Sequence, residues 1–284
     1  MKNTKRLKKP VFFRVIICLI ILFIFIKILD YYGSSDSLPE YPSYEKMVLE
    51  NYLDMQKIYT GKISKNAENF LYLQTGLTSV GINNLREECG SLAEFVEKLH
   101  IYQEQLFSGI EPVQILPLED GDILVSLSQR FCYYPHGHAA IVVDGEKGEI
   151  LEAKSYRAGS CIGNVEKWEK MNSFVVLRVK DEVIQDFKGR GEKNPVYEAT
   201  SYAKENLVGL KYSLMKDIRP LSDTTPQYTQ CAHLVWYAYY VSGLDIDENR
   251  GFIIKPKDFL KSDTLEIVQV YGISPEKVLK MRNE

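Results

Sequence analysis

The sequence has few cysteines, no excess of positive charge beyond its first 30 residues and only one long apolar run. Five cysteines in 284 residues are too few to form the scaffold of a small disulfide-dependent fold. Residues 1–30 contain seven Lys or Arg residues and one acidic residue, so a net charge of −3 for the whole chain leaves −9 for residues 31–284. Nucleic-acid-binding domains need a basic surface, and we therefore expect no nucleic-acid partner. There is no internal repeat, and an apolar fraction of 45% indicates a globular protein.

The N-terminal part of the chain differs in composition from the rest. Residues 1–10 are rich in Lys and Arg, and residues 11–29 form an apolar run long enough to cross a bilayer as a helix. Because basic flanks stay on the cytoplasmic side, we expect a cytoplasmic basic arm (1–10), a single-pass transmembrane signal anchor in the cell membrane (11–29), a linker (30–42) and an extracellular remainder. A cleaved secretory signal with residues 15–26 as its apolar core is the alternative, although no A-x-A cleavage site is present.

The spacing of apolar residues divides the remaining chain into two parts. Over residues 43–117 apolar residues recur at intervals of three and four, which predicts a small helical unit that packs on or caps the rest. Residues 118–284 begin with short runs rich in Val and Ile, such as GDILVSL, HAAIVVDG and EILEA, which predict antiparallel strands. Helices are expected from Pro195 and over residues 229–243, and a last strand over residues 265–271. The expected fold class is α+β, with an antiparallel sheet packed against helices.

Cys231, in the segment QYTQCAHLVWYAYY, is the candidate nucleophile. Its helix can begin no earlier than the turn after Pro226, which places Cys231 in the first helical turn. There, unpaired backbone N–H groups and the positive end of the helix dipole stabilise a thiolate, and the same N–H groups could stabilise an oxyanion on a substrate carbonyl. His233 lies two positions further on and points to a different side of the helix, so it cannot serve Cys231 as a base.

His138 is the candidate base. It opens the apolar run HAAIVVD after a Pro/Gly turn, where its ring would lie half-buried at the edge of the sheet. A histidine there can deprotonate Cys231 and later protonate a leaving group, provided that a third polar group fixes its tautomer. Glu152 on the next strand could accept a hydrogen bond from the other ring nitrogen if Val143 pairs with Leu151.

Three other interpretations of Cys231 stay open from the residues alone. It could be an inert core residue, or it could form a disulfide with Cys132 or Cys161. It could also join Cys132, His136 and His138 in a zinc site, because alternate residues of a strand share a face. The turn that follows His136 breaks that alternation, so we expect no metal and no cofactor.

Six motifs occur in one order between about residues 118 and 272. They are GDILV, GHAAIVVDGEKGEILEA, GNVEKWEK, YAKENLVGLKYS, QCAHLVWYAY and KPKDFLKSDTLEIVQVYG. Together they resemble the permuted papain-like branch of the NlpC-type cysteine hydrolases, the YiiX/YebB-like group, in which the histidine strand precedes the cysteine helix. The resemblance implies a circularly permuted papain-like catalytic domain over residues 118–284, with Cys231 as the nucleophile, His138 as the base and Glu152 as the orienting third member.

The same resemblance implies a function. The protein would be a membrane-anchored, extracellular cysteine peptidase or amidase that cleaves amide bonds of cell-wall peptides through an acyl-enzyme. Ala232-His233 after the cysteine and the additional His136 depart from the family pattern and indicate different substrate contacts. One alternative is a thiol-dependent acyltransferase or lipid hydrolase of the lecithin retinol acyltransferase type, which shares the permuted fold. The other is a non-catalytic binding domain.

Overall fold

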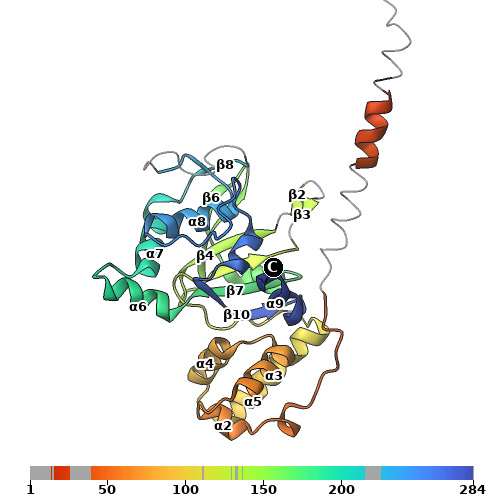
Figure 1. Ribbon diagram of the computed structural model, residues 1–284, viewed down its shortest axis with the longest axis vertical. Helices are drawn as coiled ribbons and strands as arrows, with labels where there is room; N and C mark the ends of the chain where they lie inside the picture. The colour runs from red at the N-terminus through yellow and green to blue at the C-terminus, as the bar shows by residue number, and fades with distance from the viewer. Residues whose placement is uncertain are drawn as a thin grey trace, which may run out of the picture.

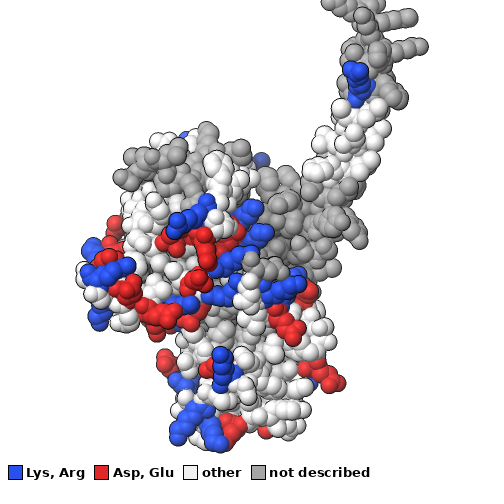
Figure 2. All heavy atoms as spheres, in the orientation of Figure 1, with Lys and Arg blue, Asp and Glu red and all other residues white. Residues whose placement is uncertain are grey.

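The computed structural model describes residues 14, 16–25, 40–110, 112–128, 130–131, 134–135, 137–214 and 225–283. The expected basic arm (1–10), most of the expected linker (30–42), and both Cys132 and His136 lie outside these residues. Residues 16–25, part of the expected anchor (11–29), form a helix (red in Figure 1) without charged side chains (Figure 2). Within the described ranges, no helix is both long and apolar enough to span a membrane.

A six-stranded sheet forms the centre of the globular part (Figure 1). Its strand order is β10-β7-β1-β4-β5-β6, and all neighbouring strands are antiparallel. The strands are β1 (Ile123–Ser126), β4 (His138–Asp144), β5 (Glu149–Ser155), β6 (Gly159–Asn164), β7 (Phe174–Val179) and β10 (Leu265–Tyr271). The expected α+β fold with an antiparallel sheet packed against helices is therefore confirmed. The sequence did not indicate β6, because GSCIGN contains two glycines and no apolar run.

Different helices cover the two faces of the sheet. On one face, Ala139 and Ile141 of β4 pack with α7 (Pro195–Asn206) and α8 (Cys231–Val241). On the other face, Ala140 and Val142 pack with the helical unit at the bottom of Figure 1. A strand that is buried on both faces needs apolar residues at consecutive positions, which explains why HAAIVVD is continuously apolar rather than alternating.

The described part of the helical unit contains four α-helices, and two of them begin after a Ser and stop at a Gly. The four helices are α2 (Met55–Tyr59), α3 (Lys65–Thr75), α4 (Ser79–Glu88) and α5 (Leu92–Ser108). The Ser64 and Ser91 side chains cap α3 and α5 by accepting hydrogen bonds from backbone N–H groups. The other described elements are η1 (Leu49–Asn51), β2 (Arg130–Phe131), β3 (Tyr134–Pro135), η2 (Val165–Lys170), α6 (Asp181–Gly189), β8 (Lys211–Tyr212), β9 (Tyr228–Thr229), η3 (Pro256–Lys261) and α9 (Pro275–Asn283).

Backbone hydrogen bonds join the helical unit to the edge strand β10. The Val270 N–H donates to the Gly76 carbonyl at 2.8 Å, and the Thr78 N–H donates to the Val268 carbonyl at 3.2 Å. Gly76 has a φ of +74°, and a Cβ there would lie 2.2 Å from the Val270 oxygen, so no larger residue fits. The helical unit therefore caps the sheet and is also bonded to it.

A buried ion pair fixes the start of β1. The Asp122 carboxylate is fully buried and accepts two hydrogen bonds from Arg178 of β7, at 2.7 Å from Nε and 2.7 Å from Nη2. It also accepts from the Glu119 N–H at 2.8 Å. Asp122 thus has a structural role.

Asp122→Ala is expected to destabilise the protein by about 3 kcal/mol or more, because the largely buried guanidinium of Arg178 would lose its buried carboxylate partner and keep only the exposed Glu119. The free energy of urea unfolding of the full-length protein measures this loss. As a matched control, Asp263→Ala removes an exposed carboxylate, and its effect is expected to stay below about 0.5 kcal/mol. Equal effects of the two substitutions would contradict the structural role of the buried pair.

Candidate active site

Cys231 is the first residue of α8, as its distance from Pro226 predicted. The Gln230 side chain caps the helix by accepting a hydrogen bond from the Ala232 N–H at 2.9 Å. N–H groups of a first helical turn have no acceptor in a preceding turn of the helix, so the thiol lies at the positive end of the helix dipole. Cys231 is a free thiol whose side chain is only 1% exposed.

The rest of α8 is a core element. Its residues from Cys231 to Tyr239 are all buried, between the sheet and α7. His233 is 1% exposed, its Nδ1 lies 3.0 Å from Thr229 Oγ1, and its ring stacks on Tyr237 at a centroid distance of 5.7 Å. His233 is therefore a packed residue of the helix, in agreement with the expectation that it does not serve Cys231.

His138 is the first residue of β4, a central strand, and follows a turn that only glycine can make. Gly137 has a φ of +74°, and a Cβ there would lie 2.7 Å from the Ser126 carbonyl oxygen. His138 pairs with Ser126 across β1 and β4, and its side chain is 13% exposed. The imidazole stacks on the fully buried Trp168, with a centroid distance of 5.7 Å and an interplanar angle of 20°. Backbone and ring are thus both held in place.

Glu152 lies beside His138, but not in the expected register. Glu152 pairs with Ala140 and Leu151 pairs with Ile141, so the expected pairing of Leu151 with Val143 is wrong by two residues. A bulge between Val142 and Asp144 takes Val143 out of the regular ladder. A shift of two residues preserves the face on which each side chain lies, so Glu152 still shares a face with His138 and is closer to it than expected.

The Glu152 carboxylate is shared between one histidine and two lysines. Its Oε2 lies 2.7 Å from His138 Nε2, and its Oε1 lies 3.2 Å from Lys167 Nζ and 3.4 Å from Lys154 Nζ. Glu152 is 3% exposed. Because Nε2 is bonded to Glu152, Nδ1 is the ring nitrogen that is left for the thiol of Cys231.

The electrostatics of the three side chains are coupled. Burial alone would lower the pKa of His138, but hydrogen bonds with Cys231 and Glu152 raise it from 6.5 to about 9. Burial alone would raise the pKa of Glu152, but the hydrogen bond and charge of His138, followed by those of Lys167, lower it from 4.5 to about 2. At neutral pH Glu152 is therefore a carboxylate, and His138 is an imidazolium that contacts Cys231.

The raised pKa of His138 predicts a loss of stability in alkaline solution. The stabilising contribution of His138 is complete below its unfolded-state pKa of 6.5 and is lost as the pH rises through its folded-state pKa of about 9. This pKa shift corresponds to about 3 kcal/mol of stability. We expect the free energy of urea unfolding to fall across this range, and to fall less in His138→Gln. The same pH dependence in parent and variant would contradict a bonded imidazolium.

The described cysteines do not pair with one another. Cys89, Cys161 and Cys231 are all free thiols, which removes the disulfide between Cys231 and Cys161. The disulfide with Cys132 and the zinc site with Cys132 and His136 involve residues outside the described ranges. Among the described residues, no group of three His, Cys, Asp or Glu side chains could hold a metal ion.

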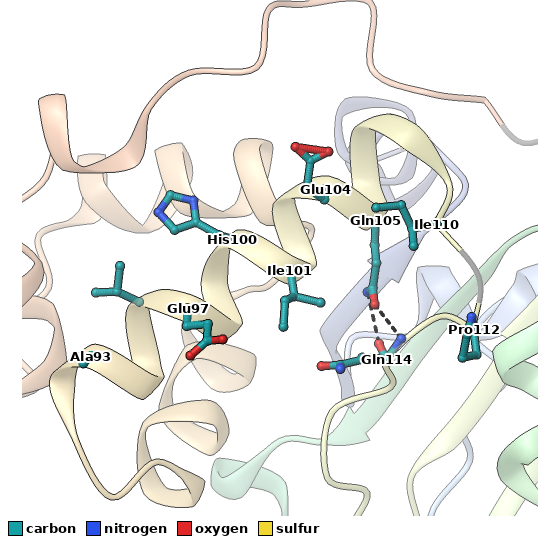
Figure 3. Close-up of a pocket in the computed structure, with 10 residues that line it drawn as sticks. Ala93, Glu97, His100, Ile101, Glu104, Gln105, Ile110, Pro112 and Gln114 are labelled. Atoms are coloured by element: carbon teal, nitrogen blue, oxygen red, sulfur yellow. Dashed lines mark hydrogen bonds between the residues drawn. The ribbon is translucent and has the colours of Figure 1, made fainter.

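A hollow of about 770 Å³ lies elsewhere, on the outer side of α5 (Figure 3). Apolar side chains including Ile101 and Ile110 line it, and Gln105 and Gln114 close one end with mutual hydrogen bonds. His100, in the middle of α5, lines it and bonds Glu50 at 2.7 Å, as a surface histidine would. None of the residues around it belongs to the group of Cys231, His138 and Glu152.

Comparison with family models, curated proteins and solved structures gives no match to this chain. Its function must therefore be inferred from its own side chains.

Three residues of the site were not foreseen from the sequence. Lys154 could have been found, because it is two residues after Glu152 on one strand and so shares its face. Lys167 comes from η2, and nothing in its local pattern connects it with Glu152. Gln230 precedes the cysteine at the helix start, but its type is not among the preferred N-caps.

Proposed function

We propose that this protein is an extracellular, membrane-anchored cysteine hydrolase that cleaves amide bonds, and that its substrates are cell-wall peptides. The observation that carries the proposal is the contact of His138 with Cys231 on one side and with Glu152 on the other. We also propose a permuted papain-like fold for residues 118–284. It is supported by a cysteine helix packed on an antiparallel sheet and by the position of His138 before Cys231 in the chain.

In the proposed reaction, Cys231 and His138 form a thiolate–imidazolium pair, in which the ring holds the proton that the thiol has lost. The thiolate attacks the substrate carbonyl. The resulting oxyanion is stabilised by the backbone N–H of Cys231 at the start of α8. As the C–N bond breaks, His138 returns the proton to the leaving amine, and an acyl-enzyme remains. His138 then takes a proton from water, the hydroxide attacks the acyl-enzyme, and the thiolate leaves. Glu152 stabilises the imidazolium and orients the ring throughout.

The protonation state of His138 favours an amide as the bond that is cleaved. An amine is a poor leaving group unless it is protonated, and a histidine with a pKa of about 9 carries the required proton at neutral pH. The imidazolium can therefore act as the general acid. The choice of cell-wall peptides follows from the family resemblance and from the expected location outside the membrane.

The test is to incubate the full-length protein separately with purified muropeptides and with phospholipid vesicles. Mass spectrometry would detect new amino termini in the first case and released or transferred acyl chains in the second. New amino termini support the proposal, whereas acyl release alone would replace it with a lipid hydrolase or acyltransferase. The absence of both products, with a folded protein, would favour a binding domain.

A further inference from the structure

The side-chain amide of Gln230 connects three groups around the thiol. Its Oε1 accepts hydrogen bonds from the Ala232 N–H at 2.9 Å and from the Cys231 thiol at 3.5 Å. Its Nε2 donates to the Ile254 carbonyl at 2.8 Å. Gln230 is 9% exposed, so these bonds are shielded from bulk water and each of them has more effect than it would at the surface.

Two of these partners determine which end of the amide faces the sulfur. The Ala232 N–H can only donate and the Ile254 carbonyl can only accept, so exchanging Oε1 and Nε2 would break both bonds. The amide oxygen therefore faces Cys231. A carbonyl oxygen can accept a hydrogen bond from a thiol, but it repels the negative charge of a thiolate.

Helix capping alone does not explain a glutamine at this position. Ser, Thr, Asn and Asp are the preferred N-caps, and each of them could accept a hydrogen bond from the second N–H of the helix. The longer glutamine reaches from the helix end to Ile254 and also places its oxygen at the sulfur. The extra length of glutamine thus makes the contacts with Ile254 and with the sulfur, which a shorter N-cap residue would not reach.

We propose that Gln230 is a positioning residue that favours the protonated form of the Cys231 thiol and so competes with His138 for the thiol proton. This inference rests on the proposed function, in which Cys231 is the nucleophile. A thiol has one proton and donates it to one acceptor at a time. When the proton moves to His138, the S–H bond breaks, an N–H bond forms on the ring, and the electron pair stays on sulfur. Gln230 therefore raises the pH at which the nucleophile forms.

The experiment measures the pH midpoint of Cys231 alkylation by iodoacetamide in the full-length protein, with Cys231 identified by peptide mass spectrometry. Gln230→Asn keeps an N-cap but withdraws the oxygen from the sulfur, so the midpoint should fall by about one pH unit, a tenfold change in thiolate fraction. Gln230→Glu keeps the length but places a negative charge there, so the midpoint should rise by a similar amount. The control Gln185→Asn, at an exposed position of α6, should not shift it.

A purely structural role for Gln230 predicts an unchanged midpoint in Gln230→Asn, and that result would overturn the inference. If the variants do not fold, the infrared S–H stretch of the parent protein tests the bond between Cys231 and Gln230. The Cys231 band is isolated by subtracting the spectrum of Cys231→Ala. A Cys231 band at the frequency of a free thiol rejects the bond to Gln230, and a lowered frequency supports it. If the parent midpoint does not depend on His138, the proposed function fails. A midpoint that depends on His138 but not on Gln230 rejects this inference alone.

Discussion

Cys231→Ala is expected to reduce kcat for amide hydrolysis by at least about ten-thousandfold. The acyl-enzyme requires a covalent bond to sulfur, and alanine leaves His138 and Glu152 without a nucleophile to activate. The α8 N–H donors would remain, and the residual rate above background would report their contribution. Release of new amino termini from muropeptides, followed by mass spectrometry, measures the loss.

The matched control is Cys18→Ser, which removes another free thiol, one that is exposed on the N-terminal helix. It should retain the parent rate. Circular dichroism should show that Cys231→Ala keeps the fold, because the change removes a single buried sulfur atom. A folded Cys231→Ala protein that still releases amino termini at the parent rate would end the proposal of a thiol hydrolase.

His138→Ala is expected to raise the pH midpoint of Cys231 alkylation by one to two units. The interaction between imidazolium and thiolate is reciprocal, so the contact that raises the pKa of His138 also favours the thiolate. Because Cys231 is 1% exposed, alkylation will be slow at every pH, and the midpoint is a better measure than the rate.

His100→Ala serves as the control for this measurement, since it removes an imidazole that bonds Glu50 on the helical unit. It should leave the Cys231 midpoint unchanged. A parent midpoint near that of a free cysteine, with no response to His138→Ala, would mean that the two residues do not share a proton. The chain would then be better explained as a binding domain.

The features that the sequence predicted correctly depend on short-range rules. The place of Cys231 in the first turn of α8 follows from the position of Pro226, and the strand that begins at His138 follows from a Pro/Gly turn before an apolar run. Glu152 was placed on the correct face because a strand has a period of two, although the register was wrong by two residues. The bulge at Val143 accounts for one residue of that shift, and nothing in HAAIVVDG marks where the ladder is interrupted.

The unforeseen features depend on residues that are distant in the chain. The orientation of the Gln230 amide is set by Ile254, 24 residues later, and Glu152 meets Lys167 only because the chain turns back after β6. Gly76 and Thr78 lie between α3 and α4. They also bond β10, about 190 residues further along, and no local spacing reveals such a partner.

The bonds of Gly76 and Thr78 to β10 affect the order in which the protein can mature. Ribosomes complete the helical unit early, yet its backbone partners Val268 and Val270 are made about 190 residues later. Until they emerge, one face of the sheet has no complete cover and its apolar surface is open to proteases and chaperones. A stop codon just before β10 would therefore disrupt the beginning of the globular part as well as its end, and nascent chains should resist proteolysis only after β10 has been made.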